Sequence, residues 1–546
     1  MAGSGGAIGS GGILAFGGSS GVGGSSAGDD GGGADSVDAA LDVGSPGEAG
    51  AGDGGPTAAA WARTVASPGI GSELLSLAVD GSGNIYVSGN LWGPGTVDFG
   101  NGVTATANHD GYNGLLVKYD AAGAPRWARA GIAGDLGPLA IDSAGNIWAL
   151  LTLGYDALGT IDFGNGVTVT KSDTLSDTVL VRYDSSGTVR WAQTVTDDSG
   201  NAGHEGGRSS LALDASGNLY VAGALAGSGR RDGGTDVAPP GTGAKLFNPA
   251  PRPVNPAYAL LVKYDSSGTA KWKRTVTATA VSGDAPHSGF GAVAVDSTGN
   301  VYVTGGIGSA LGSGTYDFGN GISAGAANSV LVKYNASGNA QWLRTGASGA
   351  LALDSTGSVY VAGSLDSGAH DLGDGVSVQG TLNQGAFLGT AGPTFPLLVK
   401  YDGVSGTTQW ARTVTTGGVS GYFSSLAVDA SGNVYAAGAA YGPGPYDFGN
   451  GANVAAASDR ENYSVLVRYS PSGVAAWARS SQHGGSGNAY DEFEAVAVDA
   501  TNGLYVAGLV AGPGGLDYGN NVTITGLPTI PETSGGGWNT LLVRYW

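Results

Sequence analysis

Two short apolar runs on either side of a polar turn recur along the chain. The first example, Leu77–Gly89, reads LAVDGSGNIYVSG. Its runs Leu-Ala-Val and Ile-Tyr-Val are almost continuously apolar instead of alternating, which predicts two strands covered on both faces. Asp80 can accept hydrogen bonds from turn amides and Gly83 can adopt a positive φ, so we expect a tight hairpin. The pattern returns at Leu139–Leu151, Leu211–Gly223, Val293–Gly305, Leu351–Gly363, Leu426–Gly438 and Val496–Gly508.

A second hairpin pattern follows these runs. Leu115–Arg129 reads LLVKYDAAGAPRWAR, which predicts two strands around an Asp-x-x-Gly turn. Further complete copies are Leu180–Gln193, Leu261–Arg274, Leu331–Arg344, Leu398–Arg412 and Leu466–Arg479. A seventh copy, Leu541–Trp546, stops where its turn should begin, and its missing half, WARTV, stands alone at Trp61–Val65. We therefore expect the two ends of the folded region to complete one sheet together.

The repeat predicts an all-β architecture. Four antiparallel strands per unit and seven units describe a seven-bladed β-propeller, whose last blade is closed by strand 61–65. The expected domains are a disordered tail at residues 1–59 and the propeller at residues 60–546. The short turns of every unit should share one face of the disc. The long connections should share the other face, where recognition usually occurs.

Most of the long connections contain the motif Asp-Phe-Gly-Asn-Gly. Clear copies are Asp98–Gly102, Asp162–Gly166, Asp317–Gly321 and Asp447–Gly451, and weaker copies are Asp371–Gly375 and Asp517–Asn521. The flanking residues alternate, which predicts a small extra hairpin that turns at Gly-Asn. A calcium loop is the alternative, but the motif lacks the several carboxylates at alternate positions that calcium favours. A structural turn is therefore the favoured interpretation.

Composition separates the first 59 residues from the rest. They contain no Lys or Arg and almost no large apolar residue, and their seven acids supply about a third of the formal net charge of −20. Such a segment buries too little apolar surface to offset the entropy lost on ordering. We expect it to be a disordered tether, and a solvated tail without a function is the alternative.

The charge distribution excludes one class of partner. Seven of the 24 Lys and Arg residues fall at one repeat position and six at another, and the remainder form no patch. Nucleic-acid binding is therefore not expected, because it needs clustered basic residues. The chain has no cysteine, no apolar span long enough to cross a membrane and no recognisable export signal. We expect a monomer.

The motifs LAVDxSGNxYVxG, DFGNG and LVKYDxSGxxxWAR resemble the bacterial β-propeller repeat family known as SBBP. The resemblance covers Trp61 to Trp546. It implies a propeller in an exported or cell-surface bacterial protein, in a family whose molecular roles are mostly open. The Gly/Ser/Asp-rich tail is similar to the tethers of bacterial surface lipoproteins, although the lipidated cysteine is absent. The expected location is extracellular or at the cell surface, with either a start upstream of Met1 or no anchor.

A weaker similarity concerns the tryptophan in each second hairpin. The run Asp120-x-x-Gly123-x-x-x-Trp127 is similar to the tryptophan-docking motif of quinoprotein propellers, one residue shorter. The resemblance implies that each indole packs against a turn of the neighbouring blade. The residues expected in structural roles are Trp61, Trp127, Trp191, Trp272, Trp342, Trp410, Trp477 and, in the closing sheet, Tyr545. A sugar-binding aromatic ring is the weaker alternative, because periodic apolar residues are normally core.

Residues just before the first strand of each unit are the candidate ligand-binding set, because that strand is innermost in a propeller. They are Glu73, Arg208, Phe290, Tyr422, Phe423, Glu492 and Glu494. Acidic and aromatic side chains around a channel mouth suit a polar small ligand or a glycan. Simple loop packing is the alternative interpretation.

The five histidines fall in the long connections, and three have an acidic neighbour, in the pairs His109-Asp110, His204-Glu205 and His370-Asp371. A metal or acid–base site at the channel mouth would use His204, Glu205, His287, His370 and Asp371. Exposed loop histidines are the simpler interpretation, which also covers His109 and His483. No HExxH or CxxC motif and no repeated spacing supports the metal.

The favoured function is a non-catalytic surface or secreted scaffold that binds a glycan or a protein through its long connections. No cofactor is expected, and calcium is the alternative. No nucleophile motif stands in a strand–turn–helix context. Two alternatives stay open. One is an enzyme of lyase, hydrolase or quinoprotein type acting at the channel mouth, and the other is a purely structural spacer.

Overall fold

The computed structural model describes residues 59–65, 70–154, 157–171, 177–195, 209–226, 257–279, 287–308, 314–380, 393–415, 420–442, 444–454, 462–484, 490–512, 515–525 and 538–545. Every regular element in these ranges is a β-strand. The ranges contain no helix that is long and apolar enough to cross a membrane. Residues 1–58 of the predicted tail and the candidate residues His204, Glu205 and Arg208 lie outside them, whereas Ala59 is the first described residue.

Five sheets contain four strands each, in an up-and-down order. The first consists of β2 (Gly71–Val79), β3 (Ile85–Trp92), β6 (Tyr112–Tyr119) and β7 (Pro125–Ala133). The second consists of β8 (Asp135–Ile141), β9 (Ile147–Leu153), β12 (Asp177–Tyr183) and β13 (Val189–Thr194). Another consists of β25 (Ala350–Leu353), β26 (Val359–Asp366), β29 (Thr394–Tyr401) and β30 (Thr408–Arg412), and the next of β31 (Ser420–Val428), β32 (Val434–Tyr441), β35 (Asn462–Tyr469) and β36 (Ala475–Arg479). The last consists of β38 (Tyr490–Val498), β39 (Leu504–Ala511), β42 (Trp538–Tyr545) and β1 (Ala59–Arg63).

An eight-stranded sheet contains the same up-and-down order twice. Its first half is β14 (Ser210–Leu213), β15 (Leu219–Ala226), β16 (Ala257–Tyr264) and β17 (Ala270–Thr275). Its second half is β19 (His287–Val295), β20 (Val301–Gly308), β23 (Ala327–Tyr334) and β24 (Ala340–Thr345). One parallel register pair, between Ala257 and His287, joins the halves.

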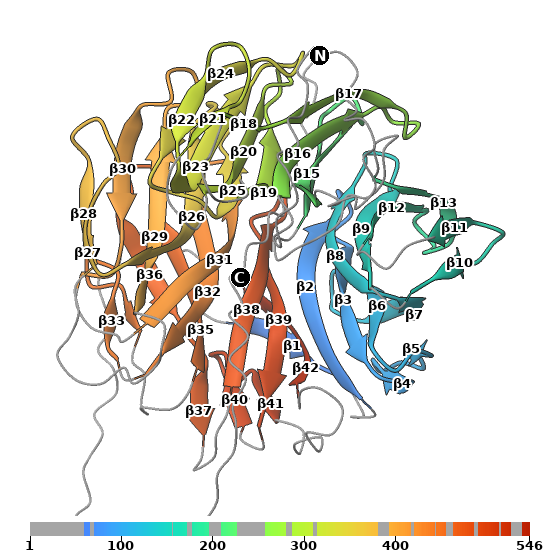
Figure 1. Cartoon of the computed structure of the whole chain (residues 1–546). Helices are drawn as coiled ribbons and strands as arrows, with labels where there is room; N and C mark the ends of the chain where they lie inside the picture. The colour runs from blue at the N-terminus through green and yellow to red at the C-terminus, as the bar shows by residue number, and fades with distance from the viewer. Residues whose placement is uncertain are drawn as a thin grey trace, which may run out of the picture.

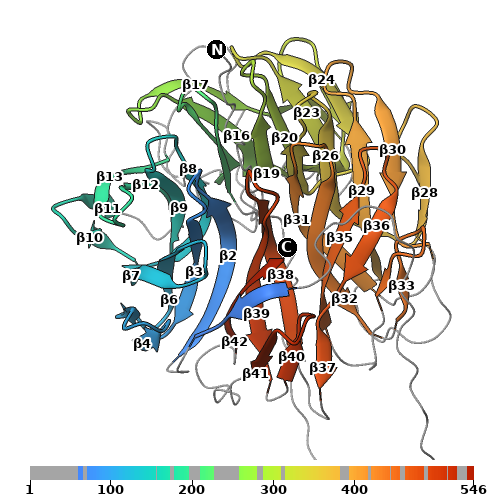
Figure 2. The same cartoon turned by 180° about the vertical axis from the view of Figure 1, so that it is seen from behind.

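The first strands of successive units lie next to one another, and we call them the inner strands: β2, β8, β14, β19, β25, β31 and β38. Each inner strand contacts the inner strand of the following unit, and β38 contacts β2. Figure 1 and Figure 2 show the sheets radiating from a common centre, with their last strands at the outside. The chain therefore has an all-β, propeller-like fold.

The first and last strands of the described chain belong to one sheet. β1 pairs antiparallel with β42, in a register that places Trp61 opposite Arg544 and Arg63 opposite Leu542. The predicted pairing of these distant segments is confirmed, although the strand covers Ala59–Arg63 instead of residues 61–65. β1 gives the outer edge of β42 a hydrogen-bonded partner, which leaves one fewer open edge in that sheet.

Each turn between the first two strands of a unit is organised by its aspartate. Asp80 Oδ1 accepts hydrogen bonds from the amides of Ser82 and Asn84, both at 2.9 Å. Gly83 adopts a φ of 78°, which L-residues with a side chain rarely do. The same capping of the i+2 amide occurs at Asp142, Asp214, Asp296, Asp354, Asp429 and Asp499. The predicted tight hairpins are therefore present.

The Asp-Phe-Gly-Asn-Gly motifs form the extra hairpins that the sequence predicts, and we call them the rim hairpins. They are β4–β5 (Gly95–Asp98 and Thr104–Ala107), β10–β11 (Gly159–Asp162 and Thr168–Lys171), β21–β22 (Thr315–Asp317 and Ser323–Gly325), β27–β28 (Gly368–Asp371 and Ser377–Gly380), β33–β34 (Tyr446–Asp447 and Asn453–Val454) and β40–β41 (Gly515–Asp517 and Thr523–Thr525). Two short strands extend them: β18 (Thr277–Thr279) pairs with β21, and β37 (Gln482–Gly484) pairs with β40.

The rim hairpins fold back along the outside of their sheets. Asn165 has a φ of 56°, and its Nδ2 donates to the carbonyl of Val189 at 3.1 Å. Val189 begins β13 just after a short turn, so the tip of this hairpin reaches the side of the short turns. The buried side chain of Phe163 supplies the apolar contact that holds it there. The expectation that all long connections stay on the opposite face is wrong for these segments.

Candidate functional site

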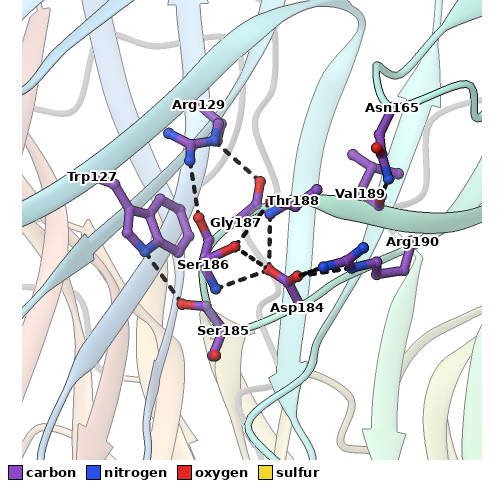
Figure 3. Close-up of polar contacts among 10 residues, drawn as sticks. All are labelled: Trp127, Arg129, Asn165, Asp184, Ser185, Ser186, Gly187, Thr188, Val189 and Arg190. Atoms are coloured by element: carbon purple, nitrogen blue, oxygen red, sulfur yellow. Dashed lines mark hydrogen bonds and ion pairs between the residues drawn. The ribbon is translucent and has the colours of Figure 1, made fainter.

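The contact between neighbouring sheets is clearest around Trp127. Its indole Nε1 donates to the carbonyl of Ser185, in the short turn of the next sheet, at 3.3 Å (Figure 3). The guanidinium of Arg129 stacks over the same indole, with 5.2 Å from Cζ to the ring centroid. Arg129 Nε then donates to the carbonyl of Gly187 at 3.1 Å, and Nη2 donates to that of Ser186 at 2.9 Å. Tryptophan and arginine together bind one turn of the adjacent sheet.

This docking recurs around the molecule. A Cβ on the turn glycine would touch the preceding sheet's indole in the pairs Gly123–Trp61, Gly268–Trp191, Gly406–Trp342 and Gly473–Trp410, and Trp272 Nε1 donates to the Ala336 carbonyl. Trp477 instead packs in a cluster with Ala59 and Tyr545, because the turn that it would face is divided between β1 and β42. The predicted docking is confirmed for six tryptophans and not for Trp477, and it accounts for the six without a sugar ligand.

The arginine two residues after each tryptophan was expected only to be part of the scaffold. Its Nε donates to the turn-glycine carbonyl in the pairs Arg63–Gly123, Arg274–Gly338, Arg344–Gly406 and Arg412–Gly473. Sequence reasoning missed this contact, although the spacing Trp-x-Arg was visible. In the second sheet the position holds Gln193, so this joint lacks the guanidinium.

A second ring of cations lies on the short-turn side. Lys118 Nζ lies 4.8 Å from the centroid of the Tyr86 ring, and the Tyr86 hydroxyl donates to Asp80 Oδ2 at 3.2 Å. The equivalent cation–ring pairs are Arg182–Trp148, Lys263–Tyr220, Lys333–Tyr302, Lys400–Tyr360 and Arg544–Tyr505. Lys333 Nζ also donates to the carbonyl of Gly403 in the next sheet at 2.7 Å. The repeated charges are therefore engaged within the scaffold.

Charged residues outside the repeat gather at the starts of three consecutive inner strands. Glu73 lies on β2, and Asp135 begins β8. Asn90 joins them, since its Nδ2 lies 3.0 Å from Glu73 Oε1 and 2.8 Å from Asp135 Oδ1. On β38, Glu492 and Glu494 are only 4% and 5% exposed. These carboxylates form an acidic arc on β38, β2 and β8.

A pair of tyrosines lies beside the acidic arc. The rings of Tyr422 on β31 and Tyr441 on β32 are 6.0 Å apart, and their hydroxyl oxygens are 3.5 Å apart. Burial, and secondarily the nearby charge of Glu494, raises the pKa of Tyr441 well above its usual range. The structure thus brings together Tyr422 and Glu494, both candidates from the sequence. It adds Tyr441, which sequence reasoning missed because it ends an ordinary second strand.

Asp491 precedes the two glutamates and has a structural role. It is fully buried, and its carboxylate accepts hydrogen bonds from the hydroxyls of Ser464 at 2.6 Å and Ser481 at 2.8 Å. These bonds join β38 to β35 and to the segment between β36 and β37. A buried carboxylate is stabilised by such donors, so this acid is best explained by packing.

Two of the aromatic candidates are core residues. Phe290 is 2% exposed and packs against Phe318 and Tyr334, and Phe423 is 1% exposed and stacks on Phe448. The prediction that they line the channel mouth is wrong. A register shift follows each of them in its strand pair, and their side chains face the core although they precede the predicted inner strands.

The described histidines do not form one site. His287 begins β19, whereas His370 lies on a rim hairpin with its Nε2 2.9 Å from the Asp366 carbonyl oxygen. Asp371 Oδ1 accepts the amide of Gly373, which organises the turn of that hairpin. His109 lies in a turn and is exposed, and β37 contains His483. The candidate metal site at the channel mouth is not formed by His287, His370 and Asp371, because the rim hairpin carries two of them outward.

The aspartates of the other rim hairpins are engaged in the same way. Asp98 Oδ1 accepts the amide of Gly100 at 2.8 Å, and Asp162, Asp317, Asp447 and Asp517 make the equivalent bond. This geometry is that of the structural turn favoured from the sequence. Within the described ranges, no group of three or more His, Cys, Asp or Glu side chains is placed to hold a metal ion.

Comparisons with known proteins find similarity among solved structures and in neither of the two sequence comparisons. No protein-family model matches the chain, and no curated protein sequence matches it. Among solved structures, a mutant of the Synechocystis apocarotenoid oxygenase is similar at 12% sequence identity and a TM-score of 0.35. The match covers 88% of this chain and 95% of that one. A similarity at this level carries no inference about activity or cofactor.

Proposed function

We propose that the protein is a seven-bladed β-propeller that acts as a non-catalytic binding scaffold, secreted or at the cell surface. Seven inner strands that contact one another in sequence, with β38 beside β2, support the blade count. The pairing of β1 with β42 supports closure by the N-terminal strand. The resemblance of the repeats to the SBBP family supports the location.

One observation carries the binding role. The polar groups that repeat on the short-turn side are used inside the scaffold: aspartates cap turns, and turn carbonyls accept bonds from the neighbouring sheet's Trp, Arg and Lys. The residues that vary from unit to unit lie at the starts of the inner strands, on the side away from the short turns. Variable residues on a rigid frame are the usual recognition surface. The proposed ligand therefore binds at the acidic arc and the tyrosine pair.

The side chains at this place indicate the ligand class. Carboxylates such as Glu73 accept hydrogen bonds from hydroxyl or ammonium groups, and the ring of Tyr422 offers a face for stacking. Both features suit a glycan, and a basic protein segment is the second candidate that the acids favour. The net charge of −20 fits either choice, because it repels anionic partners.

The test is a glycan array combined with point variants. Binding by the full chain should be weakened about tenfold in Tyr422→Ala and in Glu73→Gln, since each removes one contact. Val404→Ser, in a short turn where Val404 is 83% exposed, is the matched control and should bind normally. Cleavage or modification of a bound glycan would support the enzyme alternative instead. No binding to glycans or to basic peptides would leave the spacer as the better explanation and contradict the proposal.

A further inference from the structure

The joints between neighbouring sheets are not all filled alike. Four units have the sequence Trp-x-x-x-Val, and their valines are 1–4% exposed in the joint with the next sheet: Val65, Val195, Val276 and Val414. The first sheet departs from this pattern, because Trp127 is followed by Ala-Arg-Ala-Gly-Ile. The large apolar side chain, Ile132, therefore stands five residues after the tryptophan instead of four.

The added residue forms a bulge in β7. The register shifts between Gly114 and Leu116, which places Ile132 opposite Gly114. Gly131 adopts a φ of 95° within the bulge, a conformation suited to glycine. Ile132 remains partly exposed, in contrast to the buried valines of the four joints with the Trp-x-x-x-Val pattern. The joint between the first two sheets is consequently not closed.

A cavity of about 260 Å³ occupies this joint. Most of its lining is apolar, with the side chains of Leu116, Ile132, Leu136, Phe163 and Val189. Four residues with polar side chains join the lining: Arg129, Asn165, Tyr183 and Thr188. Figure 3 shows Arg129 and Asn165 on opposite sides of the short turn of the second sheet. An apolar pocket with a few convergent polar groups is the general form of a small-molecule site.

The Tyr183 hydroxyl has unused hydrogen-bonding capacity. The residue is 2% exposed, and its hydroxyl makes no hydrogen bond to any residue that the structure describes. The equivalent hydroxyls of Tyr334, Tyr401 and Tyr469 are also unpaired among the described residues but are buried in the core, whereas Tyr183 lines the cavity. Burial raises the pKa of this phenol well above its usual range, so it remains a donor at neutral pH.

The Arg129 guanidinium also keeps donors available. Its three nitrogens bond to the carbonyls of Ala128, Ser186 and Gly187, which uses three of five N–H groups. Among the described residues no carboxylate forms an ion pair with it. The residue is exposed, whereas the equivalent Arg63, Arg274 and Arg344 are partly buried. An anion in the cavity would therefore be attracted by the Arg129 guanidinium, whose hydrogen bonds to the described residues all go to uncharged carbonyl groups.

We propose that this cavity binds a small monocarboxylate with an aromatic or branched apolar body. The carboxylate accepts hydrogen bonds from Arg129 and Tyr183, and the apolar body packs against Leu136 and Phe163. The cavity is at the small end of ligand sites, which limits the ligand to one ring or a short branched chain. This site is independent of the acidic arc, where a carboxylate would be repelled.

The proposal is tested by titrating the full chain with phenylacetate in ligand-observed NMR. Phenylacetamide, which lacks the charge, and acetate, which lacks the apolar body, are the ligand controls and should bind at least about tenfold more weakly. Arg129→Gln should weaken phenylacetate binding about tenfold or more, and Tyr183→Phe severalfold. Arg344→Gln and Tyr401→Phe make the same changes at a joint between other sheets, and they should leave binding unchanged.

A filling variant separates binding in the cavity from binding elsewhere. Ile132→Phe places a larger side chain in the lining, and it should abolish binding while the thermal midpoint stays within a few degrees of the wild-type value. Equal losses in Arg129→Gln and Arg344→Gln would overturn the proposal, as would equal binding of phenylacetate and phenylacetamide. Absence of binding by phenylacetate and by branched aliphatic monocarboxylates such as isovalerate would overturn it as well.

Discussion

Gly187 lies directly against the indole of Trp127, so closely that a Cβ on the glycine would approach two ring carbons to 2.9 Å. The φ of Gly187 is 74°, so its conformation and its close contact both require glycine. The turn that closes one hairpin is thus also the surface on which the preceding sheet docks. Gly187 is therefore required both for the conformation of its turn and for the packing of the two sheets.

Substitution of Gly187 by alanine should destabilise the protein beyond the cost of the backbone conformation. The positive φ costs about 1–2 kcal/mol, and displacement of the indole adds about 1–3 kcal/mol. Gly164→Ala is the matched control, because Gly164 has a φ of 87° and nothing within 4 Å of the added Cβ. Denaturant unfolding of both variants measures the difference. Equal losses would show that the docking contact contributes nothing.

Substitution of Gln193 by arginine should stabilise the joint between the second and third units. Trp191 already packs on Gly268, so an arginine at this position can stack on the indole and donate to the turn carbonyls, as Arg412 does at Gly473. The expected gain is about 1 kcal/mol. Thermal unfolding should show a higher midpoint for Gln193→Arg and a lower one for Arg412→Gln. A lower midpoint in both variants would contradict a stabilising role for this arginine contact.

Removal of β1 should damage the fold far more than removal of the residues before it. The backbone of β1 bonds to β42, and Ala59 packs with Tyr545 in one apolar cluster. A chain that begins after Val65 should lose its single cooperative thermal transition, because the edge of β42 and that cluster become exposed. A chain that lacks residues 1–56 should melt near the wild-type temperature. Matching melting curves for the two truncations would disprove closure by β1.

Acid should weaken the short turns of the second hairpins. The hydroxyl of Ser186, followed by the Thr188 amide and Arg190, holds the pKa of Asp184 well below its usual range despite some burial. A depressed pKa in the folded state contributes stability while the carboxyl is ionised, and this contribution is lost as the pH falls through the folded pKa. Stability should therefore decline below a pH of about 4.

Asp184→Asn provides the comparison for the acid experiment. Asn335 occupies the equivalent turn in another unit, where its Oδ1 accepts the amides of Ser337 and Asn339. The substitution should keep the turn and remove one titrating group. Urea midpoints measured from neutral to acid pH should depend less steeply on pH in the variant. An unchanged pH dependence would exclude a role for Asp184.

High pH should destabilise the fold because it ionises the buried tyrosines of the second strands, such as Tyr435 and Tyr505. Burial, with the charge of Asp429 next in importance, raises the pKa of Tyr435 to about 12, and burial with Asp499 has the same effect on Tyr505. A raised pKa contributes stability that is complete below the unfolded value of about 10 and is lost as the pH rises through the folded value. Tyrosinate absorbance should rise together with unfolding. Tyrosinate formation by these residues without loss of structure would contradict this linkage.

The repeated motifs alone predicted a large part of the fold. The apolar runs around Asp80 and its equivalents predicted strands and tight hairpins, because the hydrogen bonds of these turns form between residues two to four apart. The divided hairpin predicted the pairing of β1 with β42, since only one orphan strand matched the unfinished one. The similarity of the Asp-x-x-Gly-x-x-x-Trp run to the tryptophan-docking motif implied that each indole docks on a turn of the next sheet.

The candidate site depended on features that the motifs do not encode. Phe290 and Phe423, each beside a bulge, lie in the core, and the fold-back of a rim hairpin carried His370 to the outside. The proximity of Tyr441 to Tyr422 and Glu494 arises where two units meet, and no spacing along the chain reports it. Alternation predicts the face of a side chain only while the register is uninterrupted.

The amino-acid sequence by itself determined the strands, the turns and the order in which they repeat, because those depend on neighbours along the chain. Only the tertiary structure decided which side chains meet across a joint. The open joint at Arg129 and Tyr183 exists because one added residue in β7 moved Ile132 out of the position that a buried valine fills elsewhere. That effect depends on the fit between two packed surfaces, and a single repeat carries information about only one of them.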